Sequence, residues 1–206
     1  MRGLLEQSGI RLRAQQLAAL WEFHRLLRAR NAADDLTRLV GFESIVVKHY
    51  VDSMIVGSMI RLPSPLLDLG TGAGFPGIPL KIRYPGIRLV LVDTHARRAA
   101  FLQDACELLQ LRDVSVRKLK ATRESLREPV AGVITRAFER IVATVDRTAG
   151  CLGSGGQLIF LKGPSVDEEL EEALDTRGDQ VTLDRDEAYT LPHTMHRRRL
   201  IVLRRR

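Results

Sequence analysis

The stretch LLDLGTGAGFPGIPLKI, residues 66–82, decides the fold of this chain. It opens with a short apolar run that ends in an acid, Asp68, and continues with glycines at alternate positions, Gly70, Gly72 and Gly74. A fourth glycine and two prolines follow, and proline is tolerated in a first helical turn because an N–H there has no partner. Glycine suits backbone that takes positive φ or approaches a ligand closely. The stretch therefore predicts a buried strand, a glycine-rich turn and the N-terminus of a helix.

Two kinds of cofactor suit such a turn. Residues 72–77, GAGFPG, match the fingerprint that places a dinucleotide pyrophosphate on a helix N-terminus. Residues 68–74, DLGTGAG, match the turn that binds S-adenosylmethionine. A carboxylate at Asp68 repels a pyrophosphate but attracts an ammonium or sulfonium group, which favours the second cofactor. A second acid, Asp93, ends the next apolar run, where it can accept hydrogen bonds from ribose hydroxyls. A turn used only for tight packing is the remaining interpretation.

The composition is that of an ordinary globular chain with a basic surface. The 206 residues are enough for one domain with an appendage. No apolar run reaches the ~18 residues of a membrane span, and the first residues lack an apolar signal region, so we expect a cytoplasmic protein. Cys106 and Cys151 have no partners at metal-ligand spacing, so we expect no disulfide framework and no metal. The net charge of +7 favours a polyanionic partner such as nucleic acid, although it also suits a merely solvated surface.

Two helical regions are expected ahead of the glycine turn, over about residues 12–30 and 42–60. The second contains His49, for which we expect a structural role. We expect residues 1–62 to form a helical cap and residues 63–206 the main domain, the two making one compact unit. The apolar face of the first helix is expected to consist of Leu17, Leu20, Trp21, His24 and Leu27.

From residue 65 onward, apolar runs alternate with helical segments, which is typical of a parallel α/β sheet. Thr94 is expected to cap the helix that ends near Gln110. The last two strands are expected to be joined by a long polar loop, residues 184–196. The expected strands cover about residues 65–69, 87–92, 113–118, 131–135, 157–163, 179–183 and 199–204.

Ligands of an open α/β sheet lie beyond the carboxyl ends of its strands. Polar residues follow several of the expected strands here, and we expect them to meet at this edge. Arg136 comes directly after an apolar strand, where it can clamp a carboxylate or a phosphate, or form a structural salt bridge. Lys162 ends another strand and is either a substrate contact or a solvated strand end. Lys120, Ala121 and Thr122 follow the third strand.

These residues carry a resemblance to a known family. The runs DLGTGAGFPGIPL, LVDTHARRAAFL, ITRAF and FLKG, and the segment from Lys48 to Met54, are similar to a bacterial methyltransferase family. That family, also called the glucose-inhibited division protein B family, modifies N7 of a guanine in 16S ribosomal RNA. The likeness covers roughly residues 20–203, and GAGFPGIPL is the most specific of its phrases.

The resemblance implies a class I methyltransferase sheet of Rossmann-like topology, mostly parallel with a final antiparallel strand. It also implies helices on both faces, an N-terminal helical cap, S-adenosylmethionine as methyl donor and 16S ribosomal RNA or the small subunit as partner. Gly70, Phe75 and Arg136 would contact the cofactor. The family has an arginine followed two positions on by a glutamate where this chain reads Lys120 and Thr122, so backbone groups at Ala121 and Thr122 would have to hold the adenine end. Aligning Arg123-Glu124 instead would need an insertion.

The acceptor implied by the resemblance determines the expected mechanism. Guanine N7 has an exposed lone pair and no proton to lose, so its attack on a sulfonium methyl group needs no general base. Catalysis is then mostly positioning, with Arg136 as the positioning residue. The alternatives are a nucleotide-dependent oxidoreductase on the same fold, and a non-catalytic RNA-binding protein that kept the fold.

The C-terminus, HRRRLIVLRRR, carries two arginine clusters around a short apolar run that reads as the last strand. We expect Arg197 and Arg198, which precede the run, to contact RNA. We expect residues 204–206 to form a frayed tail. We expect the chain to be a monomer.

Overall fold

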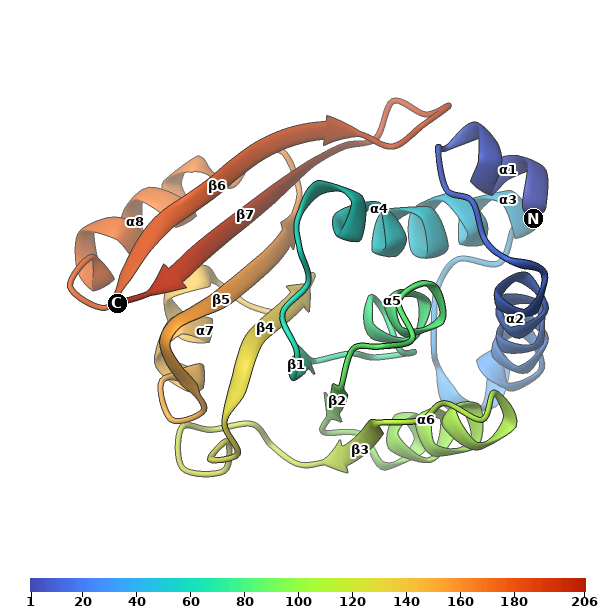
Figure 1. Cartoon of the computed structure of the whole chain (residues 1–206), viewed down its shortest axis with the longest axis horizontal. Coiled ribbons are helices and arrows are strands. Elements are labelled where there is room, and N and C mark those ends of the chain that lie inside the picture. Colours follow the sequence, from blue (N-terminus) through green and yellow to red (C-terminus); the bar gives the residue numbers. More distant parts are fainter.

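The computed structural model describes all 206 residues and contains one mixed sheet covered by helices on both faces (Figure 1). The sheet has seven strands in the order β3-β2-β1-β4-β5-β7-β6. All neighbours are parallel except β7, which runs antiparallel to both β5 and β6. The strands are β1 (Leu66–Leu69), β2 (Leu89–Asp93), β3 (Val114–Lys118), β4 (Val130–Arg136), β5 (Leu152–Lys162), β6 (Val181–Thr190) and β7 (Arg197–Arg205).

The helices divide between the two faces of the sheet. In Figure 1, the helices from α1 to α6 lie on the right, while α7 and α8 lie behind the strands on the left. The helical segments are α1 (Arg2–Gln7), α2 (Ala14–Asp34), α3 (Phe42–Ile45), the π-helix η1 (Val46–Val51), α4 (Asp52–Met59), α5 (Gly77–Arg83), α6 (Ala96–Leu108), α7 (Ile141–Thr148) and α8 (Asp167–Arg177).

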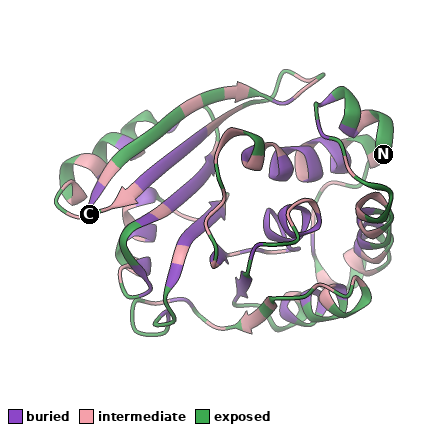
Figure 2. Ribbon diagram, viewed as in Figure 1, coloured by how far each residue is buried: buried purple, intermediate pink, exposed green.

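Side chains alternate between two apolar cores because successive strand residues point to opposite faces of a sheet. Leu66 of β1 joins the core shared with the cap, and the next residue, Leu67, joins the core beneath α7 and α8. Phe23 and Tyr50 of the cap lie in the same core as Leu66, so the cap packs directly on the sheet. Figure 2 shows the central strands as the most continuously buried elements. The division into residues 1–62 and 63–206 stays a prediction.

Several local predictions were wrong. Trp21 is 42% exposed, and Phe23 of the same helix takes the buried place instead. Helix α6 begins at Ala96 with His95 at its N-cap and no side-chain cap, so Thr94 does not cap it. The helix α1 was not predicted at all.

The end of the chain is more ordered than predicted. Strand β6 continues to Thr190, so only residues 191–196 connect it to β7 and most of the expected 184–196 loop is strand. Arg205 still belongs to β7, and the backbone N–H of Arg206 donates to the carbonyl of Gln180 at 2.9 Å. Residues 204–206 are therefore held by a strand ladder and are not a frayed tail.

Candidate active site

The glycine turn lies at the carboxyl end of β1, where the strand order reverses between β2 on one side and β4 on the other. Gly70 has φ of +71°, and a Cβ there would meet the Phe138 ring at 2.2 Å. Gly72 has φ of +59°, and a Cβ there would project into open space. Both positions require glycine, the first for close approach and the second for its left-handed backbone. The turn thus leaves its backbone open to a ligand at Gly72.

Asp68 lies beneath this turn and is fully buried. Its Oδ2 accepts hydrogen bonds from Thr71 Oγ1 at 2.6 Å and from the backbone N–H of Gly77 at 2.7 Å. Burial raises the pKa of Asp68 to about 6. Its Oδ1 is buried with no hydrogen-bond partner, a rare arrangement that a donor from a bound group or a water would complete. The carboxylate fits a site for a cationic cofactor, although its bonds in this structure are to the turn.

Asp93 holds the same turn from the end of β2. Its Oδ2 accepts the backbone N–H of Gly72 at 3.0 Å, and its Oδ1 accepts the backbone N–H of His95 at 2.9 Å. The carboxylate thereby fixes both the open glycine and His95, the residue that precedes helix α6. The side chain of Asp93 also lines a cavity beside the turn.

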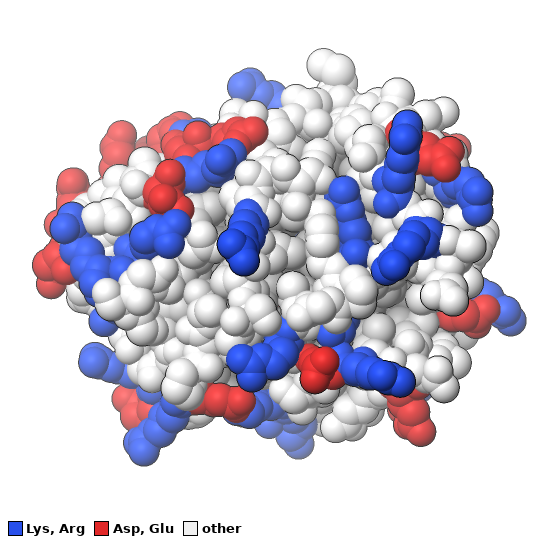
Figure 3. Space-filling model, viewed as in Figure 1, with Lys and Arg blue, Asp and Glu red and all other residues white.

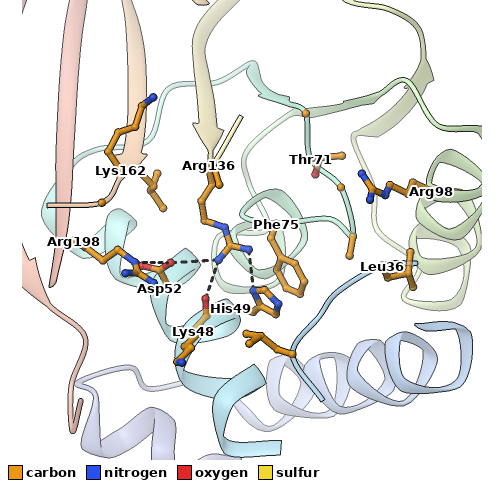
Figure 4. Close-up of a pocket in the computed structure, with 17 residues that line it drawn as sticks. Leu36, Lys48, His49, Asp52, Thr71, Phe75, Arg98, Arg136, Lys162 and Arg198 are labelled. Atoms are coloured by element: carbon orange, nitrogen blue, oxygen red, sulfur yellow. Dashed lines mark hydrogen bonds and ion pairs between the residues drawn. The ribbon is translucent and has the colours of Figure 1, made fainter. Parts of the chain in front are cut away.

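Two cavities flank the turn and share Gly70, Arg98 and Ala137 in their walls. The smaller, of about 450 Å³, is lined by Asp93 and Ala121. The larger, of about 560 Å³, is lined from the glycine turn, the cap and the ends of β4, β5 and β7 (Figure 4). The glycine turn thus has one cavity on each side of it.

Arg136 projects from the end of β4 into the larger cavity and connects the cap to the sheet (Figure 4). Its Nη1 donates to the carbonyl of Lys48 at 2.9 Å and contacts Asp52 Oδ2 at 3.3 Å, while its Nη2 donates to His49 Nδ1 at 2.9 Å. The guanidinium carbon lies 5.2 Å from the centre of the Phe75 ring. One side chain therefore ties the end of β4 to three polar groups of the cap and to the aromatic residue of the turn.

Asp52 is the second centre of this cluster and is only 2% exposed. Its Oδ2 lies 3.3 Å from Arg136 Nη1 and 3.5 Å from Arg198 Nε, and its Oδ1 accepts the hydroxyl of Tyr189 at 3.1 Å. Burial raises the pKa of Tyr189, so this hydroxyl stays protonated and is a donor. Elements far apart in the chain, α4, β4, β6 and β7, thus meet at one carboxylate.

His49 completes the wall, stacked on Phe75 with ring centres 4.3 Å apart. Because arginine can only donate, His49 Nδ1 must accept from Arg136, and its Nε2 carries the proton that it donates to Thr37 Oγ1 at 2.8 Å. Burial, together with the charge of Arg136, lowers the pKa of His49 to about 3. Both ring nitrogens are engaged, so the imidazole is neutral and is not free to act as a base.

The neutral His49 predicts a pH dependence of stability. Its pKa is about 3 when folded and 6.5 when unfolded, so the unfolded state binds more protons between these values. The contribution of the neutral His49 to the free energy of unfolding is complete above about pH 6.5 and is lost as the pH drops toward 3. Lowering the pH from 7.5 to 5 should therefore lower the free energy of unfolding by about 2 kcal/mol through this group.

Urea unfolding of the wild type and of His49→Gln at both pH values measures this effect. A glutamine oxygen can still accept from Arg136 but does not titrate, so the variant should lose about 2 kcal/mol less than the wild type between the two conditions. An identical loss in both proteins would show that His49 is not held neutral.

The sequence around this site matches a known family. The sequence model described as rRNA small subunit methyltransferase G matches residues 16–202. The chain belongs to this family. The ribosomal RNA small subunit methyltransferase G 2 of Syntrophobacter fumaroxidans is 47% identical over 205 residues, which are 100% of this chain but 41% of that longer protein. The protein of the same name from Bdellovibrio bacteriovorus is 40% identical over 188 residues, covering 91% of this chain and 72% of that protein.

Solved structures show the same fold at low sequence identity. A SAM-dependent methyltransferase from Aquifex aeolicus is 17% identical with a TM-score of 0.59, covering 78% of this chain and 92% of that one. TrmN from Thermus thermophilus is 15% identical with a TM-score of 0.61, covering 76% of this chain and 49% of that one. The predicted family and the predicted fold class are confirmed. The predicted enzyme class, a methyltransferase, and the predicted donor, S-adenosylmethionine, agree with this membership.

Most of the predicted site residues line one of the two cavities, but some do not. Arg198 and Lys162 line the larger cavity, but the Lys162 ammonium is bound to Glu169 at 2.5 Å and to the carbonyl of Glu139 at 2.6 Å. Arg197 lines neither cavity. Those that line one or both cavities are Gly70, Gly72, Phe75, Asp93, Ala121, Arg136, Lys162 and Arg198.

Thr122 lies outside both cavities and is engaged in its own turn. Its backbone N–H donates to Ser125 Oγ at 2.8 Å, so this group is not free for an adenine ring. Gly74 and the buried Asp68 also line neither cavity, and a Cβ at Gly74 would meet Ile78 at 2.5 Å within the fold. Of the two groups expected to hold the adenine end, only Ala121 lines the smaller cavity.

Sequence reasoning missed Asp52 and Tyr189 and gave His49 only a structural role. The one available signal was the family-like segment from Lys48 to Met54, which contains both His49 and Asp52. It also lies around a π-helix, a feature found frequently at functional sites. No helix of the structure has the length and apolar character needed to cross a membrane. No three His, Cys, Asp or Glu side chains are grouped as metal ligands.

Proposed function

We propose that this chain transfers a methyl group from S-adenosylmethionine to N7 of a guanine in 16S ribosomal RNA. One observation carries the proposal: the larger cavity opens directly from the glycine turn, and its two possible bases, His49 and Asp52, are both engaged by Arg136. His49 has both nitrogens engaged, and the carboxylate of Asp52 is bound by two arginines and a tyrosine. Attack by N7, which has no proton to lose, is the reaction that such a cavity suits. The names of the family and of its relatives support the class of RNA.

Several residues of the chain would hold the cofactor. S-adenosylmethionine supplies a methyl group activated by a positively charged sulfur. Gly72 leaves room for close approach to the backbone, Asp93 can accept from ribose hydroxyls, and Ala121 lines the cavity on the adenosine side. Asp68 contributes negative charge beneath the turn together with an unpaired acceptor, Oδ1. These features suit a cationic ligand better than a pyrophosphate, which disfavours the oxidoreductase alternative.

The chain's contribution to catalysis is positioning. Arg136 fixes the cap against the turn, so the two cavities keep a constant relation to one another. Alignment of two reactants can supply roughly 7–11 kcal/mol of a barrier. No residue needs to move a proton, which agrees with the engaged nitrogens of His49.

Two measurements test this proposal. Calorimetric titration should show binding of S-adenosylmethionine and none of NADH, and the reverse result would support an oxidoreductase. Mass mapping of 16S ribosomal RNA from cells with and without the gene should show one 7-methylguanosine that disappears with the gene. Binding of S-adenosylmethionine with no change in the RNA would leave the non-catalytic RNA-binding protein as the better account.

The RNA is expected to approach from the edge of the sheet where β7 begins. Figure 3 shows lysine and arginine side chains distributed over the face of the molecule in view. Arg197 lies at the same edge as the cavities because β7 runs antiparallel to β5, pairing Arg199 with Lys162. Arg206 lies beyond the other end of β7. Both side chains are exposed and neither forms an ion pair.

Replacement of Arg197 by alanine should therefore raise the KM for small ribosomal subunits and flatten its salt dependence. Each lost phosphate contact changes the slope of log K against log salt by about 0.7 for single-stranded RNA. Arg206→Ala is the matched control and should change neither quantity. A larger effect at Arg206 would place the RNA on the opposite edge of the sheet.

A further inference from the structure

Asp52 is the only acidic side chain in the wall of the larger cavity. The same wall contains five basic side chains, Lys48, Arg98, Arg136, Lys162 and Arg198. A lone carboxylate that is 2% exposed among so many cations is costly unless its contacts are strong.

The contacts of Asp52 are long for a charged pair. The 3.3 Å and 3.5 Å separations from Arg136 and Arg198 exceed the ≈ 2.7–2.9 Å that is usual for charge-assisted hydrogen bonds. A carboxylate offers about four acceptor positions, so acceptor capacity is left over. Tyr189 donates to Oδ1 at 3.1 Å and holds the carboxylate in place. The carboxylate of Asp52 is thus held in place and can still accept further hydrogen bonds.

Arg198 supplies a donor beside this acceptor. Its side chain is 25% exposed, and its Nε faces Asp52. Its Nη1 donates to the carbonyl of Arg197 at 3.2 Å, which leaves Nη2 without a protein acceptor. Figure 4 shows Arg198 and Asp52 side by side at the wall of the cavity. The pair presents one donor next to a carboxylate acceptor.

This pattern is complementary to one base. Guanine carries the O6 acceptor, the N1–H donor and the exocyclic amino donor in a row along its Watson–Crick edge. Adenine carries an amino donor and a bare ring nitrogen there, so a carboxylate opposite it would face an acceptor. Guanine read in this way leaves N7, on its other edge, directed away from Asp52.

We propose that Asp52 and Arg198 read the Watson–Crick edge of the acceptor guanine. Asp52 accepts from N1–H and the exocyclic amino group, and Arg198 donates to O6. The proposal rests on the proposed function and names the residues that select its base. Tyr189 is a positioning residue that orients the carboxylate.

The arrangement also matches the charge flow of the transfer. N7 forms a bond to the methyl carbon as the carbon–sulfur bond breaks, and the electron pair of that bond stays on sulfur. No proton moves, but one positive charge passes from sulfur to the guanine ring. A carboxylate at N1–H stabilises this ring more after the transfer than before it, which is the condition for lowering a barrier.

The first test uses the wild-type chain alone. The acceptor guanine is mapped first, and small subunits are then reconstituted with guanosine or with inosine at that position. Inosine lacks only the exocyclic amino group. Loss of a hydrogen bond to a charged group should lower kcat/KM by about ten- to a hundredfold. Equal rates on the two substrates would overturn the proposal, whether or not any variant folds.

The second test uses Asp52→Asn, with Asp179→Asn as a matched control at an exposed position outside both cavities. The Asp52 variant should lose activity on guanosine and also lose most of the preference for guanosine over inosine. The control should keep both. A full preference in the Asp52 variant would overturn the proposal. No methyl transfer by the wild type to guanosine-containing subunits would instead refute the proposed function.

Discussion

Replacement of Arg136 by alanine is expected to abolish methyl transfer and to lower the free energy of unfolding by about 3–5 kcal/mol. The guanidinium is mostly buried, and it contacts Asp52, His49 and the carbonyl of Lys48. Its removal leaves Asp52 buried with only the more distant Arg198 as a cationic partner. It also releases the cap from the end of β4, so the two cavities lose their fixed relation.

Two control variants make the Arg136 result interpretable. Arg136→Lys keeps the charge but cannot reach three acceptors from one planar group, so it should fold better than the alanine variant and still be impaired in transfer. Arg177→Ala removes an arginine that forms a two-pronged pair with Asp146 away from both cavities, and it should cost less than about 1 kcal/mol. Urea unfolding and transfer assays measure both properties. A stable and fully active Arg136→Ala would contradict the role of this residue.

Replacement of Gly72 by alanine is expected to weaken S-adenosylmethionine binding by tenfold or more, which corresponds to about 1.4 kcal/mol. The Cβ would project into the open space of the larger cavity, against the surface where the cofactor is placed by our proposal. The residue has φ of +59°, so the substitution should also cost roughly 1–2 kcal/mol of stability.

Gly155→Ala separates these two effects. Gly155 also has positive φ, +77°, and open space at its Cβ, but it lies in β5 outside both cavities. Both variants should lose similar stability, and only Gly72→Ala should lose cofactor affinity in a calorimetric titration. Equal affinity for the cofactor in the two variants would show that the turn at Gly72 does not bind it.

The sheet and its ligand-binding edge were predictable because their signals are local. The run that ends in Asp68, the three alternating glycines and the acid at Asp93 each indicate a strand end or a turn without knowledge of the rest of the chain. The parallel pattern then places the carboxyl ends of those strands together. Arg136 was predictable for the same reason, since it follows directly on an apolar strand.

The second half of the site was not predictable because it depends on tertiary contact. Tyr189 donates to Asp52 across 137 positions of sequence, and β6 extends to Tyr189 only because it pairs with β7. A polar stretch on an edge strand has the composition of a loop, so the sequence predicts a loop over residues 184–196 where β6 continues to Thr190. In the sequence, Asp52 has the pattern of a solvated helical residue, because the two arginines that contact it, Arg136 and Arg198, belong to distant strands. The direction of Asp68, toward Thr71 and Gly77, is likewise visible only in the folded turn.

One measurement identifies the atom that receives the methyl group. The purified chain is incubated with S-adenosylmethionine bearing a deuterated methyl group and with small subunits from cells lacking the gene. The same incubation is repeated with 7-deazaguanosine at the mapped position, where carbon replaces N7. Mass spectrometry of the digested RNA should find the label in a single 7-methylguanosine, and none after the replacement. Label on another atom or base, or transfer that persists with 7-deazaguanosine, would contradict the account.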